Sequence, residues 1–331
     1  SEMCIRDRSS DNNIIGNNAT NNDWGIVLDR GSYGNTLRTN KLDGNNYGLE
    51  VHTHDVPVND VDVSNTVNGK PIYYWINKAD MTVPVDAGYV VLANCTGILV
   101  QNLNLTRNGE GVLLVYTKNS TITNNDLTYN YDGIQLQYSN NNTISNNNIS
   151  HNSESGIYLA ASADGNTVSE NYIANNEYGV YIDNTYSAYN FIFHNNFVHN
   201  DHQTNVHDGR AVWDDSYPSG GNYWSDYADV DLYCGAYQNE TGSDGIWDHP
   251  YQIGWSEADR YPLVNPCTVF LPTDVNRDGA VNIMDIAIVA KAYGSKLGDL
   301  NWNPIADVST PYGEINIMDV AAVARDYGKT T

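Results

Sequence analysis

The residues best suited to chemistry form a loop of oxygen ligands in the last fifth of the sequence, from residue 274 to residue 285. Oxygen-bearing side chains occupy loop positions 1, 3, 5, 9 and 12, and a glycine stands at position 6, where the loop must turn sharply. Ca²⁺ takes about six to eight oxygen ligands, and this spacing can wrap them around one ion. We therefore expect Ca²⁺ as a cofactor, with the ligands Asp274, Asn276, Asp278, Ala280 (through its carbonyl), Asn282 and Asp285.

A second copy of the loop follows, but its front half is imperfect. Residues 313–319 repeat residues 279–285 with two substitutions, whereas the segment from Asp307 to Asp319 is one residue too long for the loop. Pro311 and Tyr312 also replace the acidic region near loop position 5. The sequence leaves calcium binding here open, and the candidate ligands of this degenerate loop are Asp307, Ser309, Glu314, Asn316 and Asp319.

An amphipathic helix is expected after each loop, because apolar residues recur at helical spacing before Gly294 and again before Gly328. This duplicated loop-helix unit resembles type I dockerins, which bind cohesin domains of scaffold or surface proteins. The resemblance implies a cohesin-like partner that contacts loop positions 10 and 11; alternatively, these residues are the core of a small domain. Such a domain has little core, so we expect its folding to be coupled to calcium. The candidate docking residues are Ile283, Met284, Ile317 and Met318.

Most of the chain before this module is repetitive. A glycine followed by alternating apolar residues recurs, and from Gly111 onward the successive spacings are 22, 23 and 23 residues. A second apolar pattern interleaves with the first, so each period holds about three very short strands. Such strands form one coil of a solenoid, in which every inward side chain lies over its equivalent one period away. The repeated glycines are Gly25, Gly48, Gly111, Gly133, Gly156 and Gly179.

Polar residues share the same period. An amide stands three residues after the first apolar residue of the interleaved pattern, and an amide carries both a donor and an acceptor. Stacked amides at a turn can therefore hydrogen-bond along the solenoid axis, which predicts an Asn ladder. Its expected members are Asn17, Asn40, Gln101, Asn125, Asn147, Asn171 and Asn195.

The combined pattern, Asn-Thr-Ile-x-x-Asn-x-Ile, a polar turn and Tyr-Gly-Ile-x-Leu, resembles the parallel β-helix repeats of NosD-type proteins in the carbohydrate-binding and sugar-hydrolase (CASH) group. The resemblance spans about residues 9–200 and implies a right-handed coil. The predicted fold is therefore mainly β, a right-handed parallel β-helix with three short strands per coil of ~23 residues. A small α-helical, dockerin-like domain with EF-hand-like calcium loops is expected to follow.

We expect five parts in the chain. Residues 1–8 are taken as a non-native or truncated start, and residues 9–207 as the β-helix, with an insertion around 52–87. An aromatic-rich cap (208–265), a linker (266–273) and the dockerin-like domain (274–329) follow. The cap aromatics either cover the last coil or stack on sugars.

Cys234 and Cys267 are the one plausible disulfide pair, with bridging left open. A further calcium site is considered at Asp226, Asp229, Asp231, Asp244 and Asp248.

Composition limits the classes of partner. The sequence has 40 acidic and 16 basic residues, a formal charge of -24, which argues against nucleic acid and suits a divalent cation. No apolar run approaches the roughly 18 residues of a membrane-spanning helix. Asn-x-Ser/Thr sequons are frequent, as on a glycosylated surface protein. We therefore expect an extracellular location, either secreted or attached to the cell surface.

One predicted sheet carries a strip of outward amides, acids and aromatic rings that suits contact with a polysaccharide, the other expected partner. No complete catalytic motif is present; an enzymatic version would be a polysaccharide lyase or glycoside hydrolase with clustered carboxylates. The alternatives are a non-catalytic adhesin or scaffold with the β-helix as spacer, and copper handling by converging histidines, for which His194, His199, His202 and His207 are the candidates. The candidate glycan strip comprises Glu50, Gln135, Tyr158, Tyr181 and Asp183.

Overall fold

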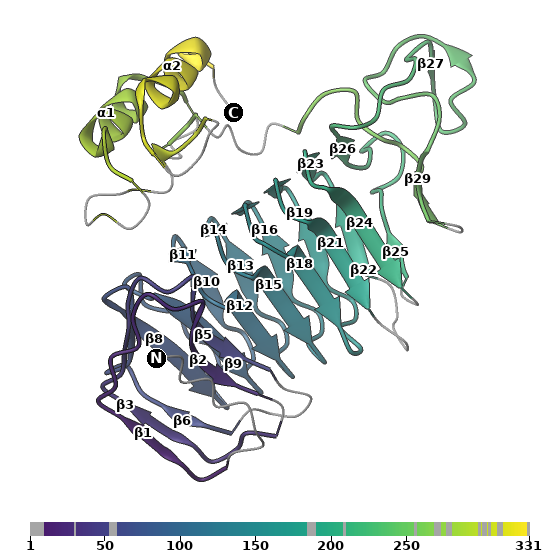
Figure 1. Cartoon of the computed structure of the whole chain (residues 1–331). Helices are drawn as coiled ribbons and strands as arrows, with labels where there is room; N and C mark the ends of the chain where they lie inside the picture. The colour runs from purple at the N-terminus through teal and green to yellow at the C-terminus, as the bar shows by residue number, and fades with distance from the viewer. Residues whose placement is uncertain are drawn as a thin grey trace. The chain divides into compact units, whose positions relative to one another are not determined.

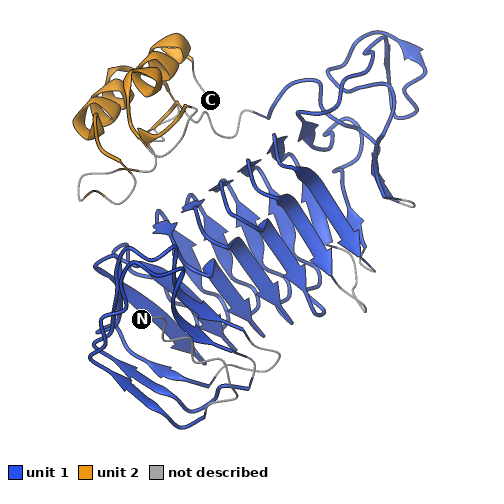
Figure 2. Cartoon of the chain, in the orientation of Figure 1, with its two compact units in different colours: residues 1–267 blue, residues 268–331 orange. Residues whose placement is uncertain are grey.

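A computed structural model describes residues 10–29, 31–52, 58–183, 190–207, 210–254, 257–267, 273–275, 280–296, 299, 303, 306–309 and 314–329. The expected non-native start, residues 1–8, lies outside the described residues. The chain divides into two compact units, residues 1–267 and 268–331 (Figure 2). The first unit contains all the strands and the second contains two helices (Figure 1). The boundary between the units falls inside the predicted linker.

Three parallel sheets form the walls of a parallel β-helix with three strands per coil (Figure 1). Equivalent strands of successive coils pair in register, as Ile122 with Ile144 and Ile134 with Ile157 show. The largest wall, in spatial order, contains β24 (His202–His207), β21 (Tyr178–Asp183), β18 (Ser155–Ala160), β15 (Asp132–Gln137), β12 (Glu110–Val115), β9 (Tyr89–Ala93), β8 (Lys70–Ile76), β7 (Thr66–Val67) and β4 (Lys41–Leu42).

The other two walls of the main coils have six strands each. Most of these strands have three residues, because the chain turns at a residue with positive φ at nearly every corner, such as Asn124 and Asn146. One wall contains β10 (Leu99–Gln101), β13 (Thr121–Thr123), β16 (Thr143–Ser145), β19 (Thr167–Ser169), β22 (Asn190–Phe193) and β25 (Ala211–Val212). The other contains β11 (Asn104–Thr106), β14 (Asp126–Thr128), β17 (Asn148–Ser150), β20 (Tyr172–Ala174), β23 (Asn196–Val198) and β26 (Tyr223–Trp224).

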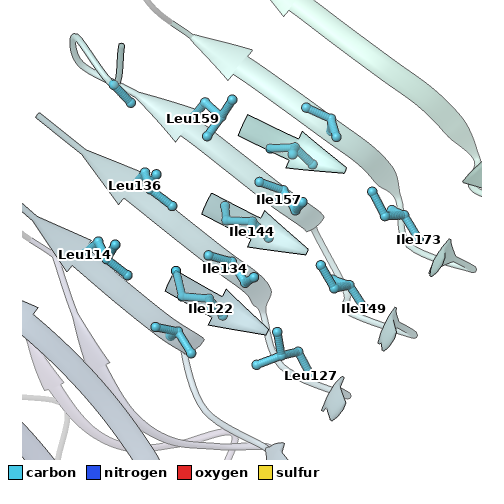
Figure 3. Packing of buried hydrophobic residues seen from close by; sticks show 14 of the residues in the cluster. Leu114, Ile122, Leu127, Ile134, Leu136, Ile144, Ile149, Ile157, Leu159 and Ile173 are labelled. Carbon is cyan, nitrogen blue, oxygen red and sulfur yellow. The ribbon is translucent and has the colours of Figure 1, made fainter. Parts of the chain in front are cut away.

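The core of the main coils consists of aliphatic columns that run along the solenoid axis (Figure 3). Each column repeats one inward position, and its side chains have no exposed surface. Burial of apolar area at this repeat is the main favourable term in folding. The columns include Ile122, Ile144 and Val168 on one wall, Leu127, Ile149 and Ile173 on the second, and Leu114, Leu136 and Leu159 on the third.

In the main coils, three Asn ladders, one at each corner, replace the single predicted ladder. Asn17 and Asn40, which were predicted in that ladder, belong to a separate one that runs through Asn65 in the N-terminal coils. In the predicted one, the side-chain amide of Asn125 donates to Asn147 Oδ1 at 2.9 Å, and Asn147 donates in turn to the next coil. Gln101 was wrongly placed in this ladder: it pairs in register with Thr123, and the backbone N–H of Leu103 occupies the ladder position. The two further ladders run through Asn130, Asn152, Asn176 and Asn200, and through Asn142, Asn166 and Asn190.

Residues 10–67, here called the N-terminal coils, form a separate stack with its own core. β1 (Asn13–Ile15), β3 (Thr36–Arg38) and β6 (Asp60–Val61) form one sheet, and β2 (Trp24–Leu28) pairs with β5 (Tyr47–Val51). This core is completed by the outward side chains of β8, β9 and β12, such as Val91 and Leu113. The alternate side chains, such as Val90 and Val112, belong to the main core. β9 and β12 are therefore buried on both faces.

The predicted insertion, residues 52–87, contains both coil and connection. β6 and β7 stack on β3 and β4 as parts of a regular coil. The chain then reverses at Asn68 and Gly69, which both have positive φ as a tight hairpin requires, and β8 runs antiparallel to β7. β8 pairs in parallel with β9, so this hairpin is the point at which the chain passes from the N-terminal coils to the main coils.

The segment after β25 covers the last coil. The indoles of Trp213 and Trp224 are buried in the main core, and Trp224 stacks on Phe197 at 4.3 Å. The described aspartates of this segment are engaged with neighbouring groups; Asp248, for example, accepts the backbone N–H of Tyr233. Cys95, Cys234 and Cys267 are free thiols. The segment also contains two short hairpins, β27 (Tyr233–Cys234) with β28 (Glu240–Thr241), and β29 (Tyr251–Ile253) with β30 (Glu257–Asp259).

The second unit contains two short helices, α1 (Ile283–Ala292) and α2 (Ile317–Asp326). Each begins with a capping box: an Asn caps the backbone of the first turn, and the Asp three residues later accepts the backbone N–H of that Asn. These boxes place two predicted calcium ligands per helix, Asn282 with Asp285 and Asn316 with Asp319, at the helix starts. The unit has a small core that includes Val281, Val289, Ile315 and Val323.

Replacement of Asn147 by Ala tests the energetic role of the ladder. Asn147 is fully buried; it donates to the carbonyl of Ile122 at 2.9 Å and accepts the backbone N–H of Asn125 at 3.0 Å. Losing several buried partners at about 1–3 kcal/mol each should cost about 3 kcal/mol or more. Urea denaturation followed by circular dichroism measures this loss. The control Asn17→Ala, at the partly exposed end of a ladder, should cost about 1 kcal/mol, and equal losses in the two variants would contradict the account.

Candidate functional site

A sheet face with partly exposed side chains lies beyond the wall shared by the two stacks. We call the outward side chains of β15, β18, β21 and β24 the open face. Gln135 lies between the core residues Ile134 and Leu136, so alternation points it outward, and Tyr158 and Tyr181 follow it in register. The two tyrosine rings stack with centroids 5.0 Å apart and planes 9° apart, and both are partly exposed. Stacked rings of this kind give the sheet a flat aromatic surface.

Two more columns flank the tyrosines on the open face. On one side Tyr178 stacks on Tyr181 at 5.5 Å and on His202 at 5.2 Å. On the other side the carboxylate of Asp183 lies 3.5 Å from Nδ1 of His207, and both side chains are largely exposed. The face thus combines aromatic planes with hydrogen-bonding groups, the combination found in specific binding sites for small polar molecules.

The N-terminal coils form a wall next to the open face. Trp24 and Tyr47, at the starts of β2 and β5, pack against Tyr131, which precedes β15; the ring centroids of Trp24 and Tyr131 are 5.7 Å apart. The hydroxyl of Tyr47 also hydrogen-bonds to Ser153. Aromatic side chains therefore line both the floor and one side of this region.

Three carboxyl groups are buried where this wall meets the main coils, a junction we call the seam. Glu50 of β5, Glu110 of β12 and Asp132 of β15 are only 4%, 3% and 5% exposed. Glu110 accepts the hydroxyl of Tyr89, and Asp132 accepts the backbone N–H of Ser155 at 2.9 Å. Burial raises the pKa of Glu110 to about 8 and that of Asp132 to about 7, because water no longer solvates the charged forms.

His52 supplies a positive charge at the seam. Its Nε2 pairs with Glu50, and its Nδ1 lies 3.4 Å from Asp29. The hydrogen bond with Glu50 raises the pKa of His52 to about 9, so the imidazole is charged at neutral pH. The 45% exposed His52 thus pairs with Glu50 at the rim of the seam, beside the buried carboxyl groups of Glu110 and Asp132.

The structure brings together four of the five residues of the predicted strip at outward positions of one sheet: Gln135, Tyr158, Tyr181 and Asp183. Gln135 is, however, only 7% exposed. Glu50 is on a different sheet, at the seam, where it pairs with His52. The sequence interpretation missed a column whose signal was present, because the residue just before each repeated Gly follows the same period. That column comprises Glu110, Asp132, Ser155, Tyr178 and His202, in register along the sheet.

The described histidines do not converge. His194 contacts the backbone carbonyl of Ser219 at 2.9 Å, His202 stacks on Tyr178, and His207 faces Asp183. Within the described ranges, no group of three or more His, Cys, Asp or Glu residues could hold a metal ion. The histidine cluster that copper handling would need is therefore not found in the described part of the chain.

The first predicted calcium loop is only partly visible, because Asn276 and Asp278 lie outside the described residues. Asp274 and Asp285 are both buried. They stand at the first and last positions of the predicted loop, so both carboxylates have the type and the position of calcium ligands. Asp285 Oδ2 accepts the backbone N–H of Asn282 at 2.7 Å.

The second loop fits an ion less well. Asp319 Oδ1 accepts the backbone N–H of Val308 and both the N–H and the hydroxyl of Ser309, each at 2.9 Å. Asp319 Oδ2 accepts the backbone N–H of Asn316 at 2.7 Å. Protein donors already satisfy this carboxylate, and a cation would have to displace some of them.

The four candidate docking residues are exposed and do not belong to the core of the second unit. Ile283 and Met284 are 62% and 57% exposed, and Ile317 and Met318 are 62% and 54% exposed. Each pair stands at the first turn of its helix. The two helices therefore present the same pair of apolar side chains to solvent at equivalent positions.

Two similarities to solved structures have low TM-scores. The A-module of mannuronan C-5 epimerase AlgE6 from Azotobacter vinelandii is 15% identical over 60% of this chain and 73% of its own, with a TM-score of 0.27. The A-module of AlgE4 from the same organism is 11% identical over 62% and 78%, with a TM-score of 0.23. No curated protein matches the chain. No described helix is long and apolar enough to cross a membrane.

A family model supports the resemblance inferred from the repeats. The model described as "Periplasmic copper-binding protein (NosD)" matches residues 53–229, which include most of the main coils and the start of the segment that covers them. The expected NosD-type parallel β-helix is thereby confirmed. Because the match extends over more than half of the sequence, the chain belongs to the NosD family.

Proposed function

We propose that the chain binds a polysaccharide on its open face and is attached by its second unit, a calcium-dependent dockerin-like module, to a cohesin-like domain of a scaffold or surface protein. The proposed setting is extracellular, secreted or attached to the cell surface. The observation that carries the glycan proposal is the stacked pair Tyr158 and Tyr181 on a partly exposed, hydrogen-bonding sheet face.

The open face has the chemistry that a sugar chain needs. The apolar faces of sugar rings can lie on aromatic planes, while amide and carboxylate groups beside the rings accept and donate hydrogen bonds. Here Asn205 continues the tyrosine column, and Asp183 and His207 flank it. The columns run across four successive coils, so the surface is elongated along the solenoid axis, as an extended polymer requires.

The distribution of carboxylates favours binding over cleavage. Hydrolysis of a glycoside needs two carboxyl groups that both reach the substrate. On the four strands of the open face, Asp132 is buried and Asp183 is exposed. Glu50 and Glu110 are sealed in the seam. We therefore propose that the β-helix binds a glycan without cleaving it. The first test below distinguishes this function from cleavage and from a spacer role without glycan binding.

Removal of the tyrosine pair tests the glycan proposal. A glycan array with the full chain should identify a bound polysaccharide. Tyr158→Ala/Tyr181→Ala should weaken its binding roughly 5- to 150-fold by calorimetry, since each ring contributes about 0.5–1.5 kcal/mol. Tyr116→Ala/Tyr138→Ala removes a pair stacked at 4.7 Å at a turn and should leave the affinity unchanged. No binding to any glycan, or equal effects of the two double variants, would favour the spacer role; shortened glycan products would show cleavage.

The calcium proposal rests on the buried carboxylates Asp274 and Asp285. Chelation of calcium from the full chain should expose residues 268–331 to proteolysis and lower the helical circular dichroism signal, while the β-helix stays resistant. Asp285→Ala should abolish the effect of calcium. Asp319→Ala removes the matched carboxylate of the second loop and should destabilise the unit while calorimetry still detects one bound calcium. Resistance to protease that is the same with and without calcium would contradict the proposal.

The docking proposal predicts two interchangeable surfaces. A type I cohesin domain serves as the probe in calorimetry with the full chain and calcium. Ile283→Ala/Met284→Ala or Ile317→Ala/Met318→Ala alone should retain binding, because the partner can use the other exposed pair. The quadruple variant should weaken binding at least a hundredfold, since it removes the apolar anchors from both helices. If the quadruple variant still binds cohesin, these four residues do not form the docking surfaces. The calcium response of each variant shows whether its second unit still folds.

A further inference from the structure

The seam joins the two stacks through very close contacts. The backbone N–H of Gly48 donates to the carbonyl of Arg107 at 2.7 Å, and that of Gly109 donates to the carbonyl of Leu49 at 2.9 Å. A Cβ on Gly109 would lie only 2.7 Å from Cβ of Glu50. Gly109 therefore permits the N-terminal coils to approach β12 closely enough to bury the side chains between them.

Ionisable groups face this contact from every element that packs on it. The N-terminal coils contribute Asp29 at the end of β2, and Glu50 and His52 at the end of β5. The main coils contribute Arg107, whose guanidinium donates to the carbonyl of Asn45 at 3.1 Å. They also contribute carboxyl groups and tyrosines whose charges influence one another across the seam. These are Glu110 and Asp132 with Tyr74, Tyr89 and Tyr131, and further along Glu154 and Glu177.

We propose that the seam is a proton-dependent latch: the N-terminal coils stay tightly docked at Gly109 while the buried carboxyl groups hold protons, and this contact loosens as the pH rises. The geometry favours it, because Glu110 and Asp132 are buried at one junction beside the ion pair that Glu50 forms with His52. Each carboxyl that ionises there adds an uncompensated buried charge.

All the titrating groups push the latch in the same direction. Burial raises the pKa of Glu110 from its ordinary 4.5 to about 8 and that of Asp132 from 3.8 to about 7. Docking is therefore strongest below those ordinary values and weakens up to about tenfold per pH unit and per group until the raised value is reached. The raised pKa of His52, about 9, likewise stabilises docking below pH 6.5 and loses its effect as the pH rises toward 9.

Hydrogen exchange of the full chain between pH 5 and pH 7 tests the latch. In this range the carboxyl groups change their contribution, whereas His52 is still largely charged. After correction for the intrinsic exchange rate, residues 24–28 and 47–51 should lose protection at least tenfold, and residues 143–150 of the main coils should not change. The variant Gly109→Ala serves as a reference for the undocked state. Its added methyl group should raise the exchange rate at the seam at both pH values.

Isosteric neutral variants show which groups act as the latch. Glu110→Gln/Asp132→Asn keeps the size and the hydrogen-bond acceptors of both side chains and should abolish most of the pH dependence. Glu240→Gln, an exposed glutamate of β28, should behave like the unmodified chain. The proposal is overturned if seam protection is the same at pH 5 and pH 7 while Gly109→Ala exchanges fast, or if the double variant retains the full pH response.

Discussion

The vertical repeat of the coils is the constraint on which the rest of the structure depends. Once strands pair in register, every inward residue lies over its equivalent in the next coil, so a column accepts only side chains that can stack on copies of themselves. Aliphatic residues meet this condition on the walls. At the corners, the chain must bury polar backbone groups, and Asn can stack there because its amide both donates and accepts hydrogen bonds. Asn147, for example, accepts from Asn125 of one neighbouring coil and also donates to the backbone carbonyl of Ile122.

The same constraint explains where function can reside. Side chains at inward positions and at corners must stack on their equivalents in the next coil. Side chains of other types can therefore vary only in the outward columns, and the columns nearest the shared wall change from apolar to polar residues along the axis. There the N-terminal coils cover the outward side of β9 and β12, which converts Leu113 and Val115 into core residues and leaves Gln135 as the first polar member of its column. The open face therefore begins where the cover ends. A loosened seam would move Trp24 and Tyr47, which form the wall of that face, so the proposed latch and the proposed glycan surface share a boundary.

Much of this organisation could be predicted from the sequence, because a solenoid repeats its own local rules. The period, the strands and four members of the open face follow from alternation around a recurring Gly. What could not be predicted depends on contacts between segments far apart in the sequence. Glu50 satisfies the outward pattern of its own strand, yet it is buried because Gly109 approaches from another stack. Gln101 has the spacing expected of a ladder residue, but it pairs in register with Thr123 of the next strand. In its coil the backbone N–H of Leu103, and not an amide side chain, bonds to Asn125. The continuous apolar run Val112-Leu-Leu-Val115 did carry a signal, because such runs indicate strands that are buried on both faces.

The two units rely on different sources of stability, and this difference bears on how they would work together. The β-helix buries long aliphatic columns and pairs the amides of its ladders with protein atoms. The second unit has a core of a few residues around Val281 and Val323, and it buries Asp274, Asp285 and Asp319 next to that core. In the second half of this unit, Ser309 and the cap of α2 already neutralise the buried carboxylate through hydrogen bonds. The first half has the better loop for a cation. Under the two proposals made above, a glycan-binding surface of the β-helix is joined to an attachment module that folds with calcium. Calcium would then control where the glycan surface is held without altering the surface itself.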